Sequence, residues 1–289
     1  MHSGLQHLQI ADPLSDGTFP AIVQYPTTQS PGSVSIGPFI WEATLNAPLA
    51  PGRFPVCVIS HGAGGSHLLY RAIATHLART GWIVVCAEAP RDNRNDNSLS
   101  HTDEAVTRRC LQLSKTVDAL LALPQFGPGA DSQRIAIVGH SLGGCAALAL
   151  AGGQPWSRHG TPIPVKPDPR FRAAVLMAPA TPYFNAPNAL EKISVPLLVL
   201  AGEKDDITPP DAIQRTLQSL PSSARYDIVV IRNAGHYSFL SPFPTNLRRP
   251  NFPPSQDPEN FDREQFHREL PLIVERFLAN AFTPLSPTP

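Results

Sequence analysis

One serine of this chain lies in a setting that favours nucleophilic chemistry. Gly139, His140, Ser141, Leu142 and Gly143 form a G-x-S-x-G motif between the apolar run RIAIV and the small-residue run CAALALA. That strand–turn–helix context places a seryl oxygen on a sharp turn, beside the free N–H groups of a helix N-terminus. A Gly-rich structural turn would use the same letters, but the flanking strand and helix favour a nucleophile.

A nucleophilic serine needs a base, and an acid that orients the base. In folds that carry this motif, the acid and then the histidine follow the serine along the chain. The strand-like run PLLVLAG is followed by Asp205 and Asp206, and either carboxylate could orient a base. His236 follows the next such run, DIVVI, and is the predicted base. The alternative for each residue is an ordinary surface loop position.

A Gly-rich loop earlier in the chain is a candidate oxyanion site. The residues HGAGG at 61–65 directly follow the apolar run PVCVIS. A loop of this kind can turn backbone N–H groups toward a developing negative charge. We predict the N–H groups of Ala63 and Leu142 as the donors, and supporting structural roles for His61 and His140.

Short apolar runs alternate with helix-length segments over most of the chain, and together they must position these groups. Strands that are apolar throughout, each followed by a helix, predict a parallel sheet covered on both faces. The N-terminal region, residues 5–55, has short alternating runs that predict antiparallel edge strands. The predicted parallel strands are 55–60, 82–88, 134–139, 173–178, 196–201 and 226–231, and the predicted helices are 68–80, 102–123, 142–151, 211–220 and 263–282.

The predicted organisation is a single α/β domain over residues 1–289. Antiparallel edge strands occupy 1–55, the catalytic core 56–240, and a Pro-rich loop with a C-terminal helix 241–289. The segment 181–193 between two strands is short, so we expect no large lid domain. The Pro-rich run 241–258 is long for a plain connection, and such loops are often functional.

Composition excludes several classes of protein. Equal numbers of acidic and basic residues, 23 each, argue against a dedicated binder of nucleic acid or anionic membrane. No apolar run approaches the roughly 20 residues that span a bilayer, and no secretory signal is visible, so a cytoplasmic location is expected.

The four cysteines lack metal-ligand spacing and are expected to be buried thiols, with a disulfide or a metal as the alternative. The sequence leaves the oligomeric state open.

Four segments taken together resemble the α/β-hydrolase superfamily: HGAGGS, GHSLGG, AGEKDDITPP and NAGHYSF. Within it, the run SHGAGGSHLLYRAIATHLARTGWIVVCAEAPRD is similar to the dienelactone-hydrolase-like branch that includes the lipoprotein-type platelet-activating-factor acetylhydrolases. The resemblance covers residues 55–240. It implies the α/β-hydrolase fold, with helices on both faces of a mostly parallel sheet.

The resemblance also assigns roles. It implies Ser141 as the nucleophile and His236 as the general base and then the general acid. In the family's G-x-x-D pattern, counted from Gly202, it selects Asp205 over Asp206. It supports the N–H groups named above as oxyanion donors, and it implies neither a metal nor an organic cofactor.

The same resemblance points to a reaction. Proper dienelactone hydrolases carry Cys as the nucleophile, whereas Ser141 favours hydrolysis of a carboxylic ester through an acyl-enzyme. The expected substrate is a small-molecule ester with a short acyl chain, because no lid would enclose a long one. The alternatives are an amide, lactone or carbamate bond cut by the same residues, or a non-catalytic binding protein on the same fold.

Two further groups of residues are singled out near the predicted site. Glu88, Arg91 and Asp92 match a cluster of the family and are expected to form an ion pair that braces the nearby loop. Four aromatic residues are candidate walls of an acyl pocket, with core packing as the alternative for any one of them: Tyr183, Phe184, Tyr237 and Phe239.

Overall fold

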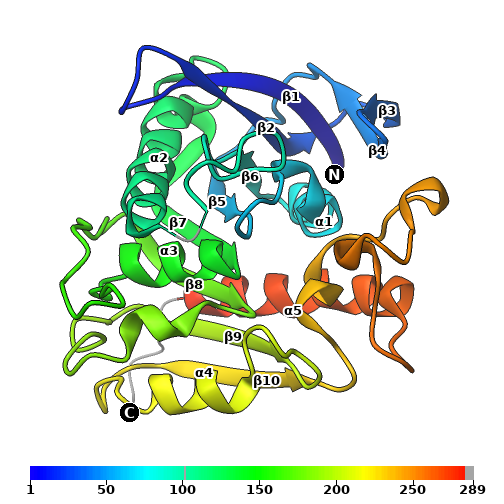
Figure 1. Ribbon diagram of the computed structural model, residues 1–289. Helices are drawn as coiled ribbons and strands as arrows, with labels where there is room; N and C mark the ends of the chain where they lie inside the picture. The colour runs from blue at the N-terminus through cyan, green and yellow to red at the C-terminus, as the bar shows by residue number, and fades with distance from the viewer. Residues whose placement is uncertain (101, 284–289) are drawn as a thin grey trace, which may run out of the picture.

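A ten-stranded mixed sheet runs through the part of the chain that the computed structural model describes, residues 1–100 and 102–283 (Figure 1). Its strand order is β10-β9-β8-β7-β5-β6-β2-β1-β4-β3. The N-terminal strands are β1 (His2–Ala11), β2 (Thr18–Thr27), β3 (Gly32–Ile36) and β4 (Phe39–Leu45). The remaining strands are β5 (Phe54–Ser60), β6 (Ile83–Ala87), β7 (Ala130–His140), β8 (Phe171–Met177), β9 (Leu197–Gly202) and β10 (Tyr226–Ile231).

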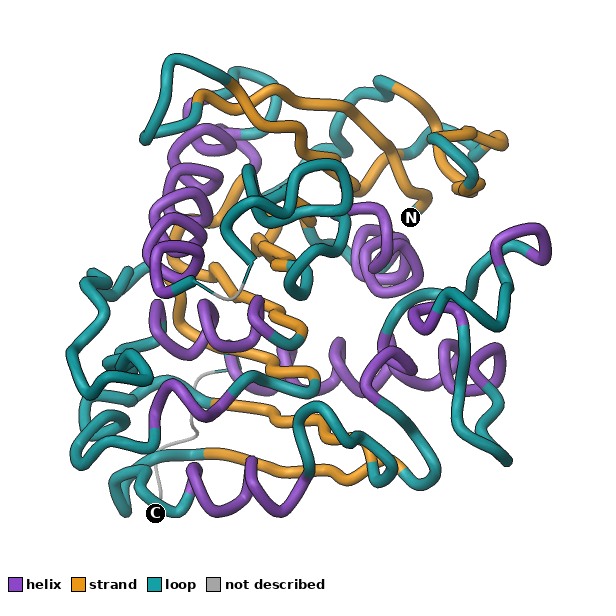
Figure 2. The backbone as a smooth tube through the Cα atoms, viewed as in Figure 1, coloured by secondary structure: helices purple, strands orange, loops and turns teal. Residues whose placement is uncertain are grey.

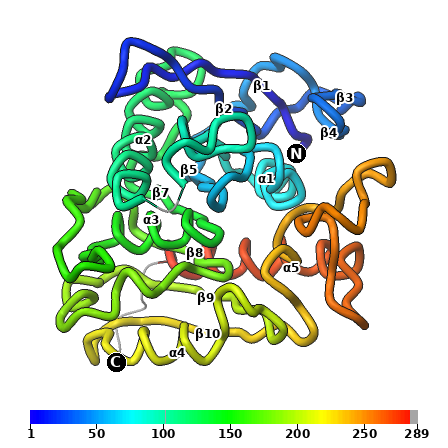
Figure 3. The backbone as a smooth tube through the Cα atoms, in the orientation of Figure 1, coloured from blue at the N-terminus to red at the C-terminus, as the bar shows by residue number. Residues whose placement is uncertain are grey.

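The six strands from β5 to β10 pair in parallel, as the sequence predicts. The N-terminal strands add antiparallel pairs, β2 with β6 and with β1, and β3 with β4, while β1 meets β4 in a short parallel contact. These strands lie at one end of the sheet and β10 lies at the other (Figure 3). Most predicted boundaries differ by one to three residues. The largest difference in a strand is at β7, which begins at Ala130 rather than at residue 134, with Ala130 paired to Phe54 across a register shift.

Helices cover both faces of the sheet (Figures 1 and 2). They are α1 (Arg71–Arg79), α2 (Asp103–Ala122), α3 (Leu142–Leu150), α4 (Pro210–Leu217) and α5 (Arg263–Ala281). The apolar faces of α1 and α5 share one core cluster, and those of α2, α3 and α4 share the other. Strand β5 serves both, since Val56 and Val58 join one cluster while Cys57 and Ile59 join the other. That two-residue alternation is the reason the central strands are apolar at every position.

The parallel arrangement brings four loops to one edge of the sheet, because parallel strands end on the same side. These loops follow β5, β7, β9 and β10, and they carry every residue of the predicted triad. The segment after β10 continues through the short 3-10 helices η4 (His236–Phe239), η5 (Thr245–Leu247) and η6 (Pro253–Ser255) and lies beside α5 (Figure 1). Arg263 of α5 holds that segment by donating to Asp257 over 2.9 Å.

Two expectations about the chain as a whole can be compared with the structure. The four cysteines are buried free thiols, as predicted, and burial raises the pKa of Cys86 to about 12. Within residues 1–100 and 102–283, no helix has both the length and the apolar character needed to cross a bilayer.

Candidate active site

Ser141 occupies a strained turn between β7 and α3. Its backbone has φ 54° and ψ −118°, a region that residues other than glycine rarely adopt. The turn leaves no room for side chains at the flanking glycines: a Cβ on Gly143 would lie 2.2 Å from the carbonyl oxygen of Ser60, and one on Gly139 would lie 2.2 Å from that of Gly143. The motif's glycines are therefore required by close backbone packing, and the seryl side chain is left half-exposed at the sheet edge.

The structure brings Ser141, His236 and Asp205 together from three different loops. The Nε2 atom of His236 is 3.0 Å from the Ser141 Oγ, and its Nδ1 is 2.8 Å from the Asp205 Oδ2. A hydroxyl can donate to Nε2 while Nδ1–H donates to the carboxylate. This is the geometry that a serine nucleophile, its base and an orienting acid require.

The carboxylate of Asp205 is fully enclosed, whereas Asp206 is exposed. The Oδ1 atom of Asp205 accepts hydrogen bonds from the N–H groups of Ile207 and Thr208 at 2.9 and 2.8 Å, and its Oδ2 accepts one from the Thr208 hydroxyl at 2.7 Å. Burial raises the pKa of Asp205, but the hydrogen bonds from His236 and Thr208 outweigh it, so the pKa falls below its ordinary value. Asp205, the carboxylate that the family resemblance implies, is the one of the two that lies against the imidazole.

The loop at 61–65 passes directly against the nucleophile. A Cβ on Gly62 would lie 3.2 Å from the Cβ of Ser141. The N–H groups of Ala63 and Leu142 donate to no partner among the described residues, so both are available to an oxyanion. His61 shapes the loop from beneath: its Nε2 accepts the N–H of Ala89 at 3.0 Å, which leaves Nδ1–H to donate to Gly62. Burial holds the pKa of His61 well below its ordinary value.

A buried ion pair braces this loop, but its cation differs from the predicted one. Arg109 of α2 pairs with Asp92, and it donates to the carbonyl of His61 over 2.6 Å. Asp92 in turn accepts the N–H of Gly64 over 3.1 Å. Arg91, the cation expected from the sequence, is exposed and bonds to Ser98 instead. The pattern of residues gave no signal for Arg109, because it sits on a helix face in an ordinary run of charged and apolar residues.

Glu88, the third member of the predicted cluster, has a different partner. Its carboxylate lies 3.1 Å from Nδ1 of His67, and both side chains are only about one-tenth exposed. The cluster thus splits into two separate pairs around the loop.

The four aromatic candidates divide by burial. Tyr183 and Tyr237 are half-buried, and the ring of Tyr237 meets that of His236 edge-on at 5.3 Å. Phe184 and Phe239 are 1% and 0% exposed, so neither ring has surface to offer a substrate. The prediction of substrate contact is not supported for these two, because their apolar character is used in the core. Sequence context alone does not distinguish an aromatic ring that packs in the core from one that contacts a substrate.

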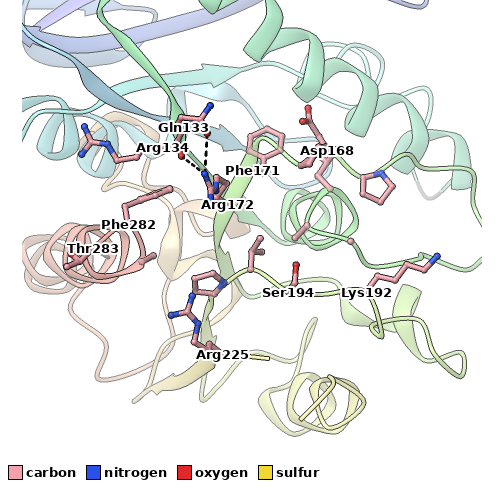
Figure 4. Close-up of a pocket in the computed structure, with 18 residues that line it drawn as sticks. Gln133, Arg134, Asp168, Phe171, Arg172, Lys192, Ser194, Arg225, Phe282 and Thr283 are labelled. Atoms are coloured by element: carbon pink, nitrogen blue, oxygen red, sulfur yellow. Dashed lines mark hydrogen bonds between the residues drawn. The ribbon is translucent and has the colours of Figure 1, made fainter. Parts of the chain in front are cut away.

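A cavity of about 800 Å³ lies at the amino ends of β8 and β9 (Figure 4). Ser141 follows the carboxyl end of β7, so the cavity is at the opposite edge of the sheet. Arg134, Arg172 and Arg225 lie along it. None of the three triad residues lines it, so it is separate from the candidate active site. Within the described residues, no cluster of His, Cys, Asp or Glu is arranged to hold a metal ion.

Comparison with known proteins addresses the family directly. The model of the dienelactone hydrolase family matches residues 41–248, well over half of the 289-residue chain, and this stretch holds all three triad residues. This chain belongs to the dienelactone hydrolase family. The predicted superfamily is confirmed, and so is the branch within it.

This dienelactone hydrolase family member is similar to several curated proteins. It is 24% identical to Cutinase est1 of Thermobifida alba, over 68% of this chain and 57% of that protein. It is 23% identical to the platelet-activating factor acetylhydrolase of Canis lupus familiaris (72% and 53%), and 27% identical to the bis(hydroxyethyl) terephthalate hydrolase of Streptomyces coelicolor (65% and 52%). The chain therefore spans slightly more than half the length of these relatives.

A solved structure supports the fold of this family member. The ferulic acid esterase from Streptomyces cinnamoneus superposes with a TM-score of 0.72, covering 100% of this chain and 93% of that one at 19% identity. The predicted α/β-hydrolase fold, without a large lid domain, is confirmed.

Proposed function

We propose that this protein is a serine hydrolase that cleaves carboxylic esters through an acyl-enzyme intermediate. The observation that carries the proposal is the pair of hydrogen bonds made by His236, whose Nε2 lies 3.0 Å from Ser141 Oγ and whose Nδ1 lies 2.8 Å from Asp205 Oδ2. Its setting supports the proposal: the three residues lie in a dienelactone hydrolase family fold, and the N–H groups of Ala63 and Leu142 donate to no partner within residues 1–100 and 102–283. The relatives named above include a cutinase, an acetylhydrolase and a terephthalate-ester hydrolase.

The proposed reaction follows from the protons each group can hold. Asp205 accepts Nδ1–H of His236, which keeps a lone pair at Nε2 to take the proton of Ser141 as its oxygen attacks the ester carbonyl. The N–H groups of Ala63 and Leu142 stabilise the resulting oxyanion. His236 then gives the proton to the departing alcohol, and water enters to hydrolyse the acyl-enzyme by the same steps in reverse.

The substrate we propose is a small-molecule ester with a short acyl group. Ser141 is half-exposed, and the loop residue Ala63 is exposed. An acyl group at this edge would have the half-buried rings of Tyr183 and Tyr237 as its apolar neighbours. The buried rings of Phe184 and Phe239 would support the site from the core without touching the acyl group.

Replacing the nucleophile tests the proposal. Ser141→Ala should lower turnover of a short-chain nitrophenyl ester by about 10⁵–10⁶-fold, since triad residues act as a unit, and should abolish labelling by a fluorophosphonate. Ser222→Ala, at an exposed serine in a loop, is the matched control and should change neither. Hydrolysis by Ser141→Ala at close to the wild-type rate would overturn the proposal. A panel with amides and lactones then shows whether esters are the preferred class.

We further propose that residues 1–289 act as one domain. Leu5 of β1, Phe39 of β4 and Leu270 of α5 belong to the same core cluster, so both ends of the chain share a core. A single cooperative transition in urea, seen alike by tryptophan fluorescence and far-UV circular dichroism, is the expected result.

A cytoplasmic location is part of the same proposal. Four free thiols suit a reducing compartment. Cell fractionation tests this, and recovery of the protein outside the cytoplasm would contradict it.

A further inference from the structure

Three loops of the candidate site are joined by one buried chain of hydrogen bonds that the proposed reaction does not use. The N–H of Gly62 lies 3.3 Å from Oη of Tyr70, and this oxygen lies 3.1 Å from Nδ1 of His140. The other ring nitrogen of His140, Nε2, lies 2.9 Å from the backbone carbonyl of His236. Tyr70 and His140 are 1% and 2% exposed, so water does not compete for these contacts.

The chemistry of the atoms leaves one arrangement of protons along this chain. The carbonyl of His236 can only accept, so Nε2 of His140 carries a hydrogen. Burial and the neighbouring His236 lower the pKa of His140 to about 3, so the ring is neutral near pH 7 and Nδ1 presents a lone pair. Tyr70 must donate its single proton to that lone pair, and its oxygen then accepts the N–H of Gly62.

Each end of this series of hydrogen bonds reaches a residue that the proposed reaction needs. Gly62 directly precedes Ala63, a proposed oxyanion donor, and His236 is the proposed base. His140 directly precedes Ser141 and stands at the end of β7. Its ring also packs against the imidazole of His236, with centroids 4.9 Å apart. The oxyanion loop and the loop of His236 are therefore both connected by hydrogen bonds to His140, the residue next to the nucleophile.

We infer that Tyr70 and His140 are positioning residues, which together set the oxyanion loop and the catalytic imidazole relative to Ser141. The inference rests on the function proposed above. Neither side chain touches substrate in this role. Tyr70 sets the Gly62–Ala63 backbone, and His140 sets the backbone of His236.

The variant Tyr70→Phe removes the hydroxyl that joins Gly62 to His140 and keeps the aromatic ring. A 1 Å misplacement of reacting groups can cost about 10²-fold in rate, so kcat should fall by about 10- to 100-fold with little change in KM. Affinity for a trifluoromethyl ketone, which forms an oxyanion at the site, should fall by a similar factor. Tyr25→Phe is the matched control: Tyr25 is also fully buried, and its hydroxyl donates to the carbonyl of Ala47 over 2.7 Å, away from the triad. It should lose stability to a similar degree while kcat stays unchanged.

A pair of substitutions at His140 tests the hydrogen bond from its Nε2 to the carbonyl of His236. His140→Gln keeps an N–H donor that can reach the carbonyl of His236, and His140→Leu does not. The glutamine variant should retain at least tenfold more kcat than the leucine variant. Equal losses in the two would overturn the role of this hydrogen bond.

A measurement without turnover separates this inference from the proposed function. Deuterium exchange in peptides covering residues 61–65 and 235–239 should become faster in Tyr70→Phe and remain unchanged in Tyr25→Phe. Should Tyr70→Phe match Tyr25→Phe in kcat, inhibitor affinity and exchange, the inference fails. If the wild-type protein hydrolyses no ester, the proposed function fails, and unchanged exchange in Tyr70→Phe would still overturn the link itself.

Discussion

The substitution Asp205→Asn removes one charge from the candidate triad and preserves the side-chain shape. The amide oxygen will replace Oδ1, because that position accepts the N–H groups of Ile207 and Thr208 at 2.9 and 2.8 Å. The NH₂ group then takes the place of Oδ2, which lies 2.8 Å from Nδ1 of His236. An amide NH₂ can only donate there, so His236 must carry its hydrogen on Nε2, the nitrogen that faces Ser141.

An imidazole with its hydrogen on Nε2 cannot accept the proton of Ser141. Forcing this tautomer costs about 10⁴-fold in kcat in a serine protease triad, equivalent to about 5 kcal/mol of transition-state stabilisation. We expect a loss of the same order here, with KM little changed. Asp206→Asn is the matched control in the adjacent residue: its side chain is exposed, so kcat should stay within about twofold of the wild-type value.

The assay is the initial rate of hydrolysis of a short-chain nitrophenyl ester near neutral pH, with circular dichroism to verify that each variant is folded. A folded Asp205→Asn enzyme that keeps more than a tenth of wild-type kcat would refute the assignment of the acid. So would an equal loss in Asp206→Asn.

Three further predictions concern stability and pH. Gly143→Ala should abolish folding or activity, because its Cβ would lie 2.2 Å from a backbone oxygen, whereas Gly32→Ala, with 4.0 Å of space, should be tolerated; soluble yield and esterase rate are the readouts. Arg109→Met leaves a buried carboxylate unpaired and should lower the free energy of unfolding by about 3–5 kcal/mol, while Arg215→Ala, in an exposed pair, should lower it by less than about 1 kcal/mol; urea denaturation measures both. Burial lowers the pKa of His140 to about 3 and that of His267 to about 4 in the folded protein, against about 6.5 for a histidine in the unfolded chain. The unfolded chain therefore binds more protons between those values, and stability should fall as the pH drops through this window. Urea midpoints at pH 7 and about pH 4.5 measure that fall, and a midpoint that does not move would count against a buried neutral ring.

Much of the fold was predictable because its signals are local. A strand buried on both faces must be apolar at every position, and this pattern located the five parallel strands from PVCVIS to PLLVLA. The sixth, YDIVVI, was located by its apolar residues although it is a largely exposed edge strand. The G-x-S-x-G motif could be interpreted for the same reason: backbone atoms approach to 2.2 Å of where a Cβ would stand, so only glycine fits.

What only the tertiary structure decided are the contacts between segments far apart in the chain. Asp205 and Asp206 are adjacent and chemically alike, so the residues themselves do not separate them, and only the family pattern implied Asp205. The physical difference is tertiary, because the structure encloses Asp205 and exposes Asp206. Asp92 pairs with Arg109 rather than with neighbouring Arg91, because the fold brings a buried position of α2 against it.

The aromatic residues and the histidine before the nucleophile show the same division. Sequence determined that Phe239 is apolar and that His140 lies in the motif, since composition and spacing are written in the chain. Burial, protonation and hydrogen-bond partners depend on what surrounds a side chain in space. The structure alone therefore placed Phe239 in the core and joined His140 to Tyr70, 70 residues away.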